Sequence, residues 1–248
     1  MTHPIRVRRD AALRYLQSGA TQAELDRMRQ WCLSRGMPDP QLAGNVVQNT
    51  WGALWSTQRY TWGGAGTTPT PQNGLFKYSL GTAYTAGGDV ASYRETNMQQ
   101  VGQIGSDQMF VAHEWGVLVR PTAFGTGQTA LDMTELMVAL TNALALEVRQ
   151  GKTYEVDYGP ISPAQLTQPG AFAAESAGPP PSATGTAAPQ YGRGLPIVEP
   201  LELDGSVVID ANFRGNLDTV PPGSVERDGA GVDVTLVLFG EWWSIVKG

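Results

Sequence analysis

Residues 96–121, TNMQQVGQIGSDQMFVAHEWGVLVRP, carry the clearest signal for the fold, because they predict two β-strands separated by a tight polar turn. Apolar residues recur through 98–104, before the turn at 105–107. A new run, in which apolar and polar residues partly alternate, begins at Met109 and should end at Pro121, since proline has no amide hydrogen for a ladder. This pattern favours a sheet protein.

The C-terminal residues 232–246, VDVTLVLFGEWWSIV, alternate in a similar way and predict a further strand. Adjacent residues of a strand point to opposite faces, so Trp242 and Trp243 cannot both enter one core. One of them is expected to meet solvent, a ligand or a neighbouring subunit, because aromatic rings are enriched at interfaces. The alternative is that one ring lies in the core and the other covers a barrel end under a loop. We take Trp242 and Trp243 as candidate interaction residues.

Most of the chain after Pro40 also reads as strands joined by turns. Thirty glycines and 17 prolines suit a sheet protein with many turns. Further strands are expected at 46–62, 75–84, 144–148, 152–158, 195–203 and 207–213, and a short helix at 131–140. The pair 144–148 and 154–156 should form a hairpin. With about eight to ten strands, the predicted fold class is all-β, an antiparallel jelly-roll barrel or sandwich.

The chain divides by charge into two predicted parts. Residues 1–40 form a basic, helical N-terminal arm with seven arginines and four acidic residues, whereas the other 208 residues hold 10 basic and 19 acidic groups. Thr21 and Glu24 fit a capping box that would start a short helix. Residues 41–248 form the jelly-roll domain, with a long loop at 169–189 that is rich in Pro, Gly and Ala.

The arm is a candidate for contact with an anionic surface, which would be a genome, membrane headgroups or an acidic neighbouring subunit. The alternative is a solvated helix packed on the edge of the barrel. The candidate contact residues are Arg6, Arg8, Arg9 and Arg14.

Composition excludes several other classes. The net charge of −6 argues against nucleic-acid binding by the main body. A single cysteine cannot form an intrachain disulfide, and no run of about 18 apolar residues is available to span a membrane. The N-terminus lacks the apolar centre of a signal peptide, so we expect synthesis in a cytoplasm.

Catalytic signals are weak, and we expect no enzyme, cofactor, metal site or small-molecule substrate. His3 and His113 are the two histidines, and neither has the spacing of a zinc site. A glycosidase-like carboxylate pair, of Glu114 with Glu95 or Glu241, remains an open alternative that the sequence cannot place in space.

Four segments together resemble a known family. They are 96–119, the hairpin region LTNALALEVRQGKTYEVDYGPIS, the Pro-bounded LPIVEPLELDGSVVIDANF after an Ala/Gly/Pro-rich loop, and the final VDVTLVLFGEWW. In this order they resemble jelly-roll capsid proteins of tailless, membrane-containing bacteriophages, over about 60% of the chain. The resemblance implies an upright β-barrel, oligomeric capsomers, no catalysis, and an arm that reaches an internal membrane or adjoining subunits.

The leading hypothesis is therefore a virion structural protein, made in the host cytoplasm, that self-assembles into the shell with copies of itself and other capsid proteins. Its arm would touch an internal membrane or the genome. One jelly roll is favoured, although residues 46–93 leave a second barrel open. The alternative function is a carbohydrate-binding β-sandwich that uses exposed tryptophans such as Trp242 or Trp62, and a third is a hydrolase with dispersed carboxylates.

Overall fold

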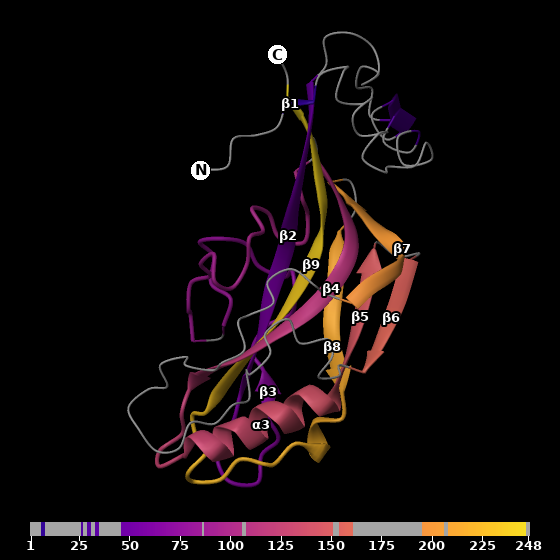
Figure 1. The fold of residues 1–248 in the computed structure, drawn as a ribbon. Helices are drawn as coiled ribbons and strands as arrows, with labels where there is room; N and C mark the ends of the chain where they lie inside the picture. Colours follow the sequence, from indigo (N-terminus) through magenta and orange to yellow (C-terminus); the bar gives the residue numbers. More distant parts are fainter. Residues whose placement is uncertain are drawn as a thin grey trace, which may run out of the picture.

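The fold consists of two antiparallel sheets and one long helix, seen in a computed structural model (Figure 1). The structure describes residues 6–7, 26, 29–30, 33–34, 46–85, 87–105, 108–150, 154–160, 195–205 and 208–246. The large sheet has the strand order β1-β2-β9-β4-β7, with β3 paired to β2, and the small sheet has the order β6-β5-β8. The expected all-β class is confirmed, in that most of the described residues outside α3 form antiparallel sheets or the loops between their strands.

The elements have the following bounds. They are β1 Arg6–Val7, β2 Val46–Thr61, β3 Thr70–Pro71, β4 Gln108–Ala123, α3 Ala130–Ala143, β5 Leu144–Gln150, β6 Tyr154–Pro160, β7 Leu195–Asp204, β8 Ile209–Gly215, the 3-10 turn η2 Leu217–Thr219 and β9 Gly231–Val246.

Strand β9 is the centre of the large sheet. It pairs with β2 over all 16 residues and with β4 over most of its length, so the three strands form a ribbon about 50 Å long. Side chains at its even positions, from Val232 to Leu238, are fully buried and face the small sheet. The alternation predicted for 232–246 is therefore confirmed as one continuous strand.

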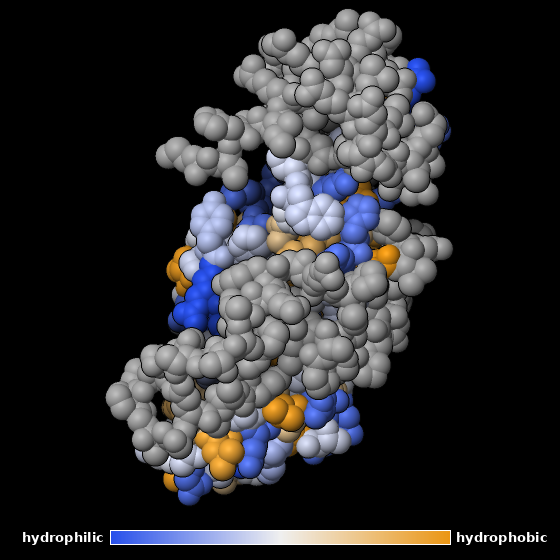
Figure 2. Space-filling model, viewed as in Figure 1, coloured by the Kyte–Doolittle hydropathy of each residue, from blue (hydrophilic) through white to orange (hydrophobic). Residues whose placement is uncertain are grey.

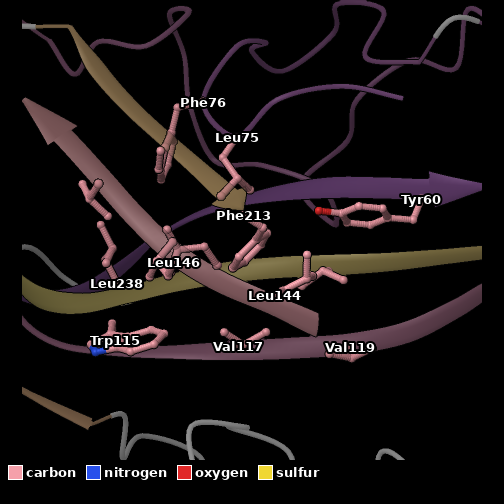
Figure 3. Close-up of a cluster of buried hydrophobic side chains, with 14 of the residues drawn as sticks. Tyr60, Leu75, Phe76, Trp115, Val117, Val119, Leu144, Leu146, Phe213 and Leu238 are labelled. Atoms are coloured by element: carbon pink, nitrogen blue, oxygen red, sulfur yellow. The ribbon is translucent and has the colours of Figure 1, made fainter. Parts of the chain in front are cut away.

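The core lies between the large sheet, the small sheet and α3. In Figure 3, β5 crosses the large sheet diagonally and brings Leu144 and Leu146 over Trp115, Val117 and Val119 of β4. Helix α3 lies across one end of the two sheets (Figure 1). The core is completed from α3 and β8 by Met133, Leu136, Met137, Leu140, Ile209, Ala211 and Phe213.

Two local predictions are confirmed by this part of the chain. Thr129 caps α3 by accepting a hydrogen bond from the amide of Asp132, and the helix ends where Leu144 becomes extended. Strands β5 and β6 form the expected hairpin, with Val148 opposite Val156. The strands expected near 195–203 and 207–213 are β7 and β8.

The strands predicted at 75–84 and 96–104 are wrong. Both regions belong to a segment, residues 72–105, that makes only isolated bridges and that we call the cover segment. Phe76 and Gly81 have φ values of 58° and 77°, which interrupt an extended run, and Gly102 has a φ of 65°. Strand β4 also continues beyond Pro121 to Ala123, through an irregularity in the ladder. The predicted turn residues 106 and 107 lie outside the described part.

The cover segment runs along the edge of β2 (Figure 1). Its middle part, which includes Asp89 and Glu95, lies over the outer face of the large sheet, which is the face opposite the small sheet. Its Leu75, Phe76, Met98 and Ile104 side chains are instead buried in the core, and Leu75 bridges Ala211 of β8. Odd-numbered residues of β9 point to this face, and Asp233, Thr235 and Val237 are nevertheless buried. Much of the large sheet is therefore covered on both sides.

Little of the predicted arm lies among the described residues. Arg6 and Val7 form β1, a two-residue strand paired with β2. Residues 26, 29, 30, 33 and 34 are helical. Arg8, Arg9, Arg14 and the loop 169–189 lie outside the described residues, so the division at residue 40 stays a prediction.

Replacing Leu146 with Ala should lower the free energy of unfolding by about 2–5 kcal/mol, because this fully buried side chain fills the space between β5 and β4. Urea unfolding followed by circular dichroism measures the change. The matched control is Leu131→Ala on α3, where the side chain is 61% exposed and the expected change is within about 0.5 kcal/mol. Equal effects at the two positions would contradict the assignment of the core.

Replacing Arg227 with Gln should give a destabilisation that depends on pH. Arg227 Nη2 lies 2.7 Å from Asp132 Oδ1, and this hydrogen bond lowers the pKa of Asp132 below its ordinary value of 3.8. The carboxylate is therefore stabilised in the folded state, an effect that is present above about pH 4 and is lost as the pH falls through the lowered pKa. Unfolding free energies of wild type and variant should thus differ most near neutral pH and converge in acid. Arg94→Gln, at an exposed position, is the control that should give a small, pH-independent change.

Candidate functional site

A buried carboxylate lies at the centre of the outer face. Asp233 of β9 is fully buried, with Oδ1 2.8 Å from Arg59 Nε on β2 and Oδ2 3.0 Å from Arg120 Nη2 on β4. The two arginines also reach the cover segment, because Arg59 Nη1 lies 2.9 Å from Asp89 Oδ2 and Arg120 Nη2 lies 3.2 Å from Glu95 Oε1. The network connects three strands with the segment above them.

This network anchors the cover segment to the large sheet. Arg59 joins Asp233 to Asp89, and Arg120 joins Asp233 to Glu95. Burial and the negative charge of Asp233 raise the pKa of the adjacent Tyr84 to about 12, so this phenol stays neutral near neutral pH. Arg59 lies over the Tyr84 ring, 5.1 Å from its centre.

The free edge of β2 is closed by side chains of the cover segment. The Asn97 amide accepts from Trp55 N at 3.0 Å and donates to Ala53 O at 2.7 Å. Asn73 repeats this pattern with Arg59 N and Thr57 O, both at 2.7 Å. Each amide therefore takes the place of a residue in a neighbouring strand.

A tyrosine fills the interval between the two asparagines. The Tyr78 hydroxyl accepts from Thr57 N at 2.8 Å and donates to Thr57 O. The outward backbone groups from Ala53 O to Arg59 N are thus bonded within the chain, and this edge cannot add a strand from another molecule without losing these bonds.

The two candidate tryptophans of β9 do point to opposite faces, as expected for an extended strand. Trp242 is half-buried and packs on Phe110, with ring centres 4.8 Å apart. It also covers Gly52, where an added Cβ would come within 2.9 Å of the indole. Trp243 lies on the outer face and is only 6% exposed. Their role in subunit contact stays a prediction.

The prediction that Trp62 is an exposed tryptophan is wrong. Its side chain is 1% exposed, and its Nε1 donates a hydrogen bond to Pro221 O at 3.0 Å. No local pattern predicts the burial of Trp62, because the loop that supplies Pro221 is 159 residues away.

Glu95 does not form the catalytic carboxylate pair with Glu114 that the sequence left open. This residue is buried, and its carboxylate accepts from Ser92 N and Ser92 Oγ while pairing with Arg120. Glu114 and Glu241 lie elsewhere on the outer face, opposite Phe239 and Trp51 respectively. Among the described residues, no group of three or more His, Cys, Asp or Glu is placed to hold a metal ion.

The sequence analysis did not predict a cluster of aromatic rings on the outer face, next to the part of that face that the cover segment covers. Trp51 of β2 is 59% exposed and stacks on His113 of β4, with ring centres 5.8 Å apart and planes inclined by 14°. His113 occupies an irregularity in β4 where it has no ladder partner, which lets its side chain turn toward Trp51. Trp55 and Phe239 are half-buried on the same face. We call Trp51, Trp55, His113 and Phe239 the aromatic platform.

Part of this cluster could have been predicted from the alternation of side chains along a strand. Residues 51, 53 and 55 share one face of any strand that contains them, so the two tryptophans had to lie on the same side. Their cross-strand neighbour Phe239 depends on pairing between segments nearly 190 residues apart, which leaves no local trace.

Comparison with protein-family models, with curated proteins and with solved structures gives no match for this chain. Within the described residues, no helix has both the length and the apolar character needed to cross a membrane.

Asn97→Ala should both destabilise the protein and promote its aggregation. The change leaves Trp55 N and Ala53 O without their protein partner, at a cost of about 1–3 kcal/mol, and it opens the edge of β2. Urea unfolding and the rate of light-scattering increase at a fixed protein concentration report the two effects. Gln99→Ala, two residues away at an exposed position, should change neither quantity appreciably. Faster aggregation of the Gln99 variant than of the Asn97 variant would rule out edge closure by Asn97.

Proposed function

We propose that this chain is a virion structural protein whose β domain is a jelly roll. The observation that carries the proposal is the order in which its strands pair. A jelly roll forms when a hairpin of eight strands rolls up, so that the first strand pairs with the eighth, the second with the seventh, the third with the sixth and the fourth with the fifth.

The pairing of this chain agrees with that scheme when β2 is counted as the first strand. The first pair is β2 with β9, the third is β4 with β7, and the fourth is β5 with β6. The second strand is reduced to Leu75, which bridges Ala211 of β8, the seventh strand. The contacts of β9 with β4 and of β8 with β5 then join the pairs into two sheets.

Two features distinguish this arrangement from a regular jelly roll. The second strand is short because the cover segment binds the β2 edge by side chains instead of by a backbone ladder. Helix α3 is inserted between the third and fourth strands, and it closes one end of the core.

Assembly into a shell is supported by the resemblance to phage capsid proteins and by the distribution of charge. The N-terminal 40 residues carry a net charge of about +3, and the remaining 208 carry about −9. Opposite charges on two parts of one chain favour contact between the arm of one copy and the body of the next, or between the arm and an anionic genome or membrane. Copies would not meet by adding a strand to the edge of β2, because that edge is closed.

The solution mass of the purified protein tests this proposal. Light scattering, combined with electron microscopy of the same fractions, should give trimers, pentamers, or fragments of shells and sheets. A monomer of 26.5 kDa at all protein concentrations, and also with anionic vesicles added, would contradict the proposal.

Replacing Arg6, Arg8, Arg9 and Arg14 with Gln should reduce the assembled fraction while the β domain stays folded. The reason is that the change removes four positive charges from the N-terminal arm. Circular dichroism checks the fold, and light scattering at about 0.15 M salt measures assembly. The control replaces the same four residues with Lys, which keeps the charge and should preserve assembly. Normal assembly of the Gln variant would exclude a role for these charges.

A further inference from the structure

The aromatic platform resembles a ligand site more than an exposed part of the hydrophobic core. Trp51 is the most exposed tryptophan among the described residues, and its ring is held from one side by His113 in a nearly parallel stack. A ring supported in this way loses little rotational freedom when a ligand covers its other side. The platform is therefore prepared for a flat partner.

The platform extends along the outer face from Trp51 to Trp55. Four residues of extended chain span about 13 Å, which is longer than a single sugar ring. Between the two tryptophans lies Ala53, whose small side chain sits beside Phe239 in the next strand. Trp55 is fixed at the far end because its Nε1 donates to Tyr93 O at 3.0 Å. The cover segment thus reaches the platform at this end and leaves Trp51 exposed.

Polar groups flank the rings. Glu241 is the cross-strand partner of Trp51, and Glu114 is the cross-strand partner of Phe239. A carboxylate offers two oxygens and about four acceptor directions, so it can accept hydrogen bonds from ligand hydroxyls in addition to its bonds within the protein. Negative charge beside the rings disfavours an acidic ligand.

We infer that the aromatic platform binds a neutral oligosaccharide, with a pyranose ring stacked on the free side of Trp51 and hydroxyl groups directed toward Glu241 and Glu114. A pyranose has an apolar face of C–H groups and a rim of hydroxyls. The first matches an aromatic plane, and the second matches carboxylate acceptors. This function is separate from assembly, and it would allow an assembled shell to attach to a glycan.

A second copy of the chain fits the platform less well. A stable protein interface needs about 800 Å² from each partner and a wide apolar centre. Of the four rings here, only Trp51 is largely exposed, and its cross-strand partner is a carboxylate, Glu241. Figure 2 shows that the coloured surface in this view is predominantly hydrophilic, with hydrophobic residues in small separate groups.

An oligosaccharide array with neutral and acidic members, probed with the full-length protein, tests the inference. Neutral oligosaccharides should bind, and acidic ones should bind more weakly. The strongest neutral member is then titrated by calorimetry against Trp51→Ala, which should raise the Kd about tenfold or more, because the central stacking ring is lost. Trp51→Tyr keeps an aromatic plane and should recover part of the affinity.

The matched control is Phe124→Ala, which removes another exposed aromatic ring (50% exposed) from the loop after β4. Its Kd should equal that of the wild type, and circular dichroism should show that all three variants are folded. Binding of no array member, or equal Kd values for wild type and Trp51→Ala, would overturn the inference. So would a lower assembled mass of Trp51→Ala in light scattering, since the platform would then be a subunit contact. Because assembly of the wild type is measured separately, failure of sugar binding and failure of the capsid proposal can be told apart.

Discussion

The large sheet depends on the pairing of one buried carboxylate, Asp233, with Arg59 and Arg120. A charged group without a partner could not occupy the centre of a sheet that is covered on both sides, because the loss of hydration would cost several kcal/mol. Two arginines from the flanking strands offset that cost, and they also extend to Asp89 and Glu95. The same interaction therefore holds β2, β9 and β4 in register and ties down the segment above them.

The position of the cover segment explains two other properties of the molecule. Its asparagine and tyrosine side chains bond the outward backbone of β2 from Ala53 O to Arg59 N, so this part of the β2 edge is closed without an additional strand. On the outer face the segment contacts the Trp55 indole through Tyr93 O, and it leaves Trp51 exposed and stacked on His113. One stretch of irregular chain thus separates a closed part of the outer face from an open one.

The proposed capsid role and the proposed glycan site use different parts of the chain. Assembly is argued from the strand order, the resemblance of four segments to capsid proteins, and the charge difference between arm and body. Glycan binding is argued from four rings and two carboxylates on the outer face of β2, β4 and β9. If the protein has both properties, the aromatic platform lies on the surface of the shell that is formed by the outer face of the large sheet.

Local sequence determined the elements whose pattern is contained within a few residues. The alternation of 232–246 predicted a strand, the apolar spacing at 131–140 predicted α3, and the turn near residue 151 predicted the hairpin. The prediction of strands at 75–84 and 96–104 from their apolar residues was wrong. Positive φ values at Phe76, Gly81 and Gly102 interrupt the extended backbone in these segments. Only the tertiary structure decided that Asp233 is buried between two arginines, that Trp62 is covered, and that Trp51 is exposed and supported by His113. Each of these outcomes depends on contacts between residues that are tens to almost two hundred positions apart. The sequence around one partner does not show which distant residue it will contact, so local patterns cannot predict such contacts.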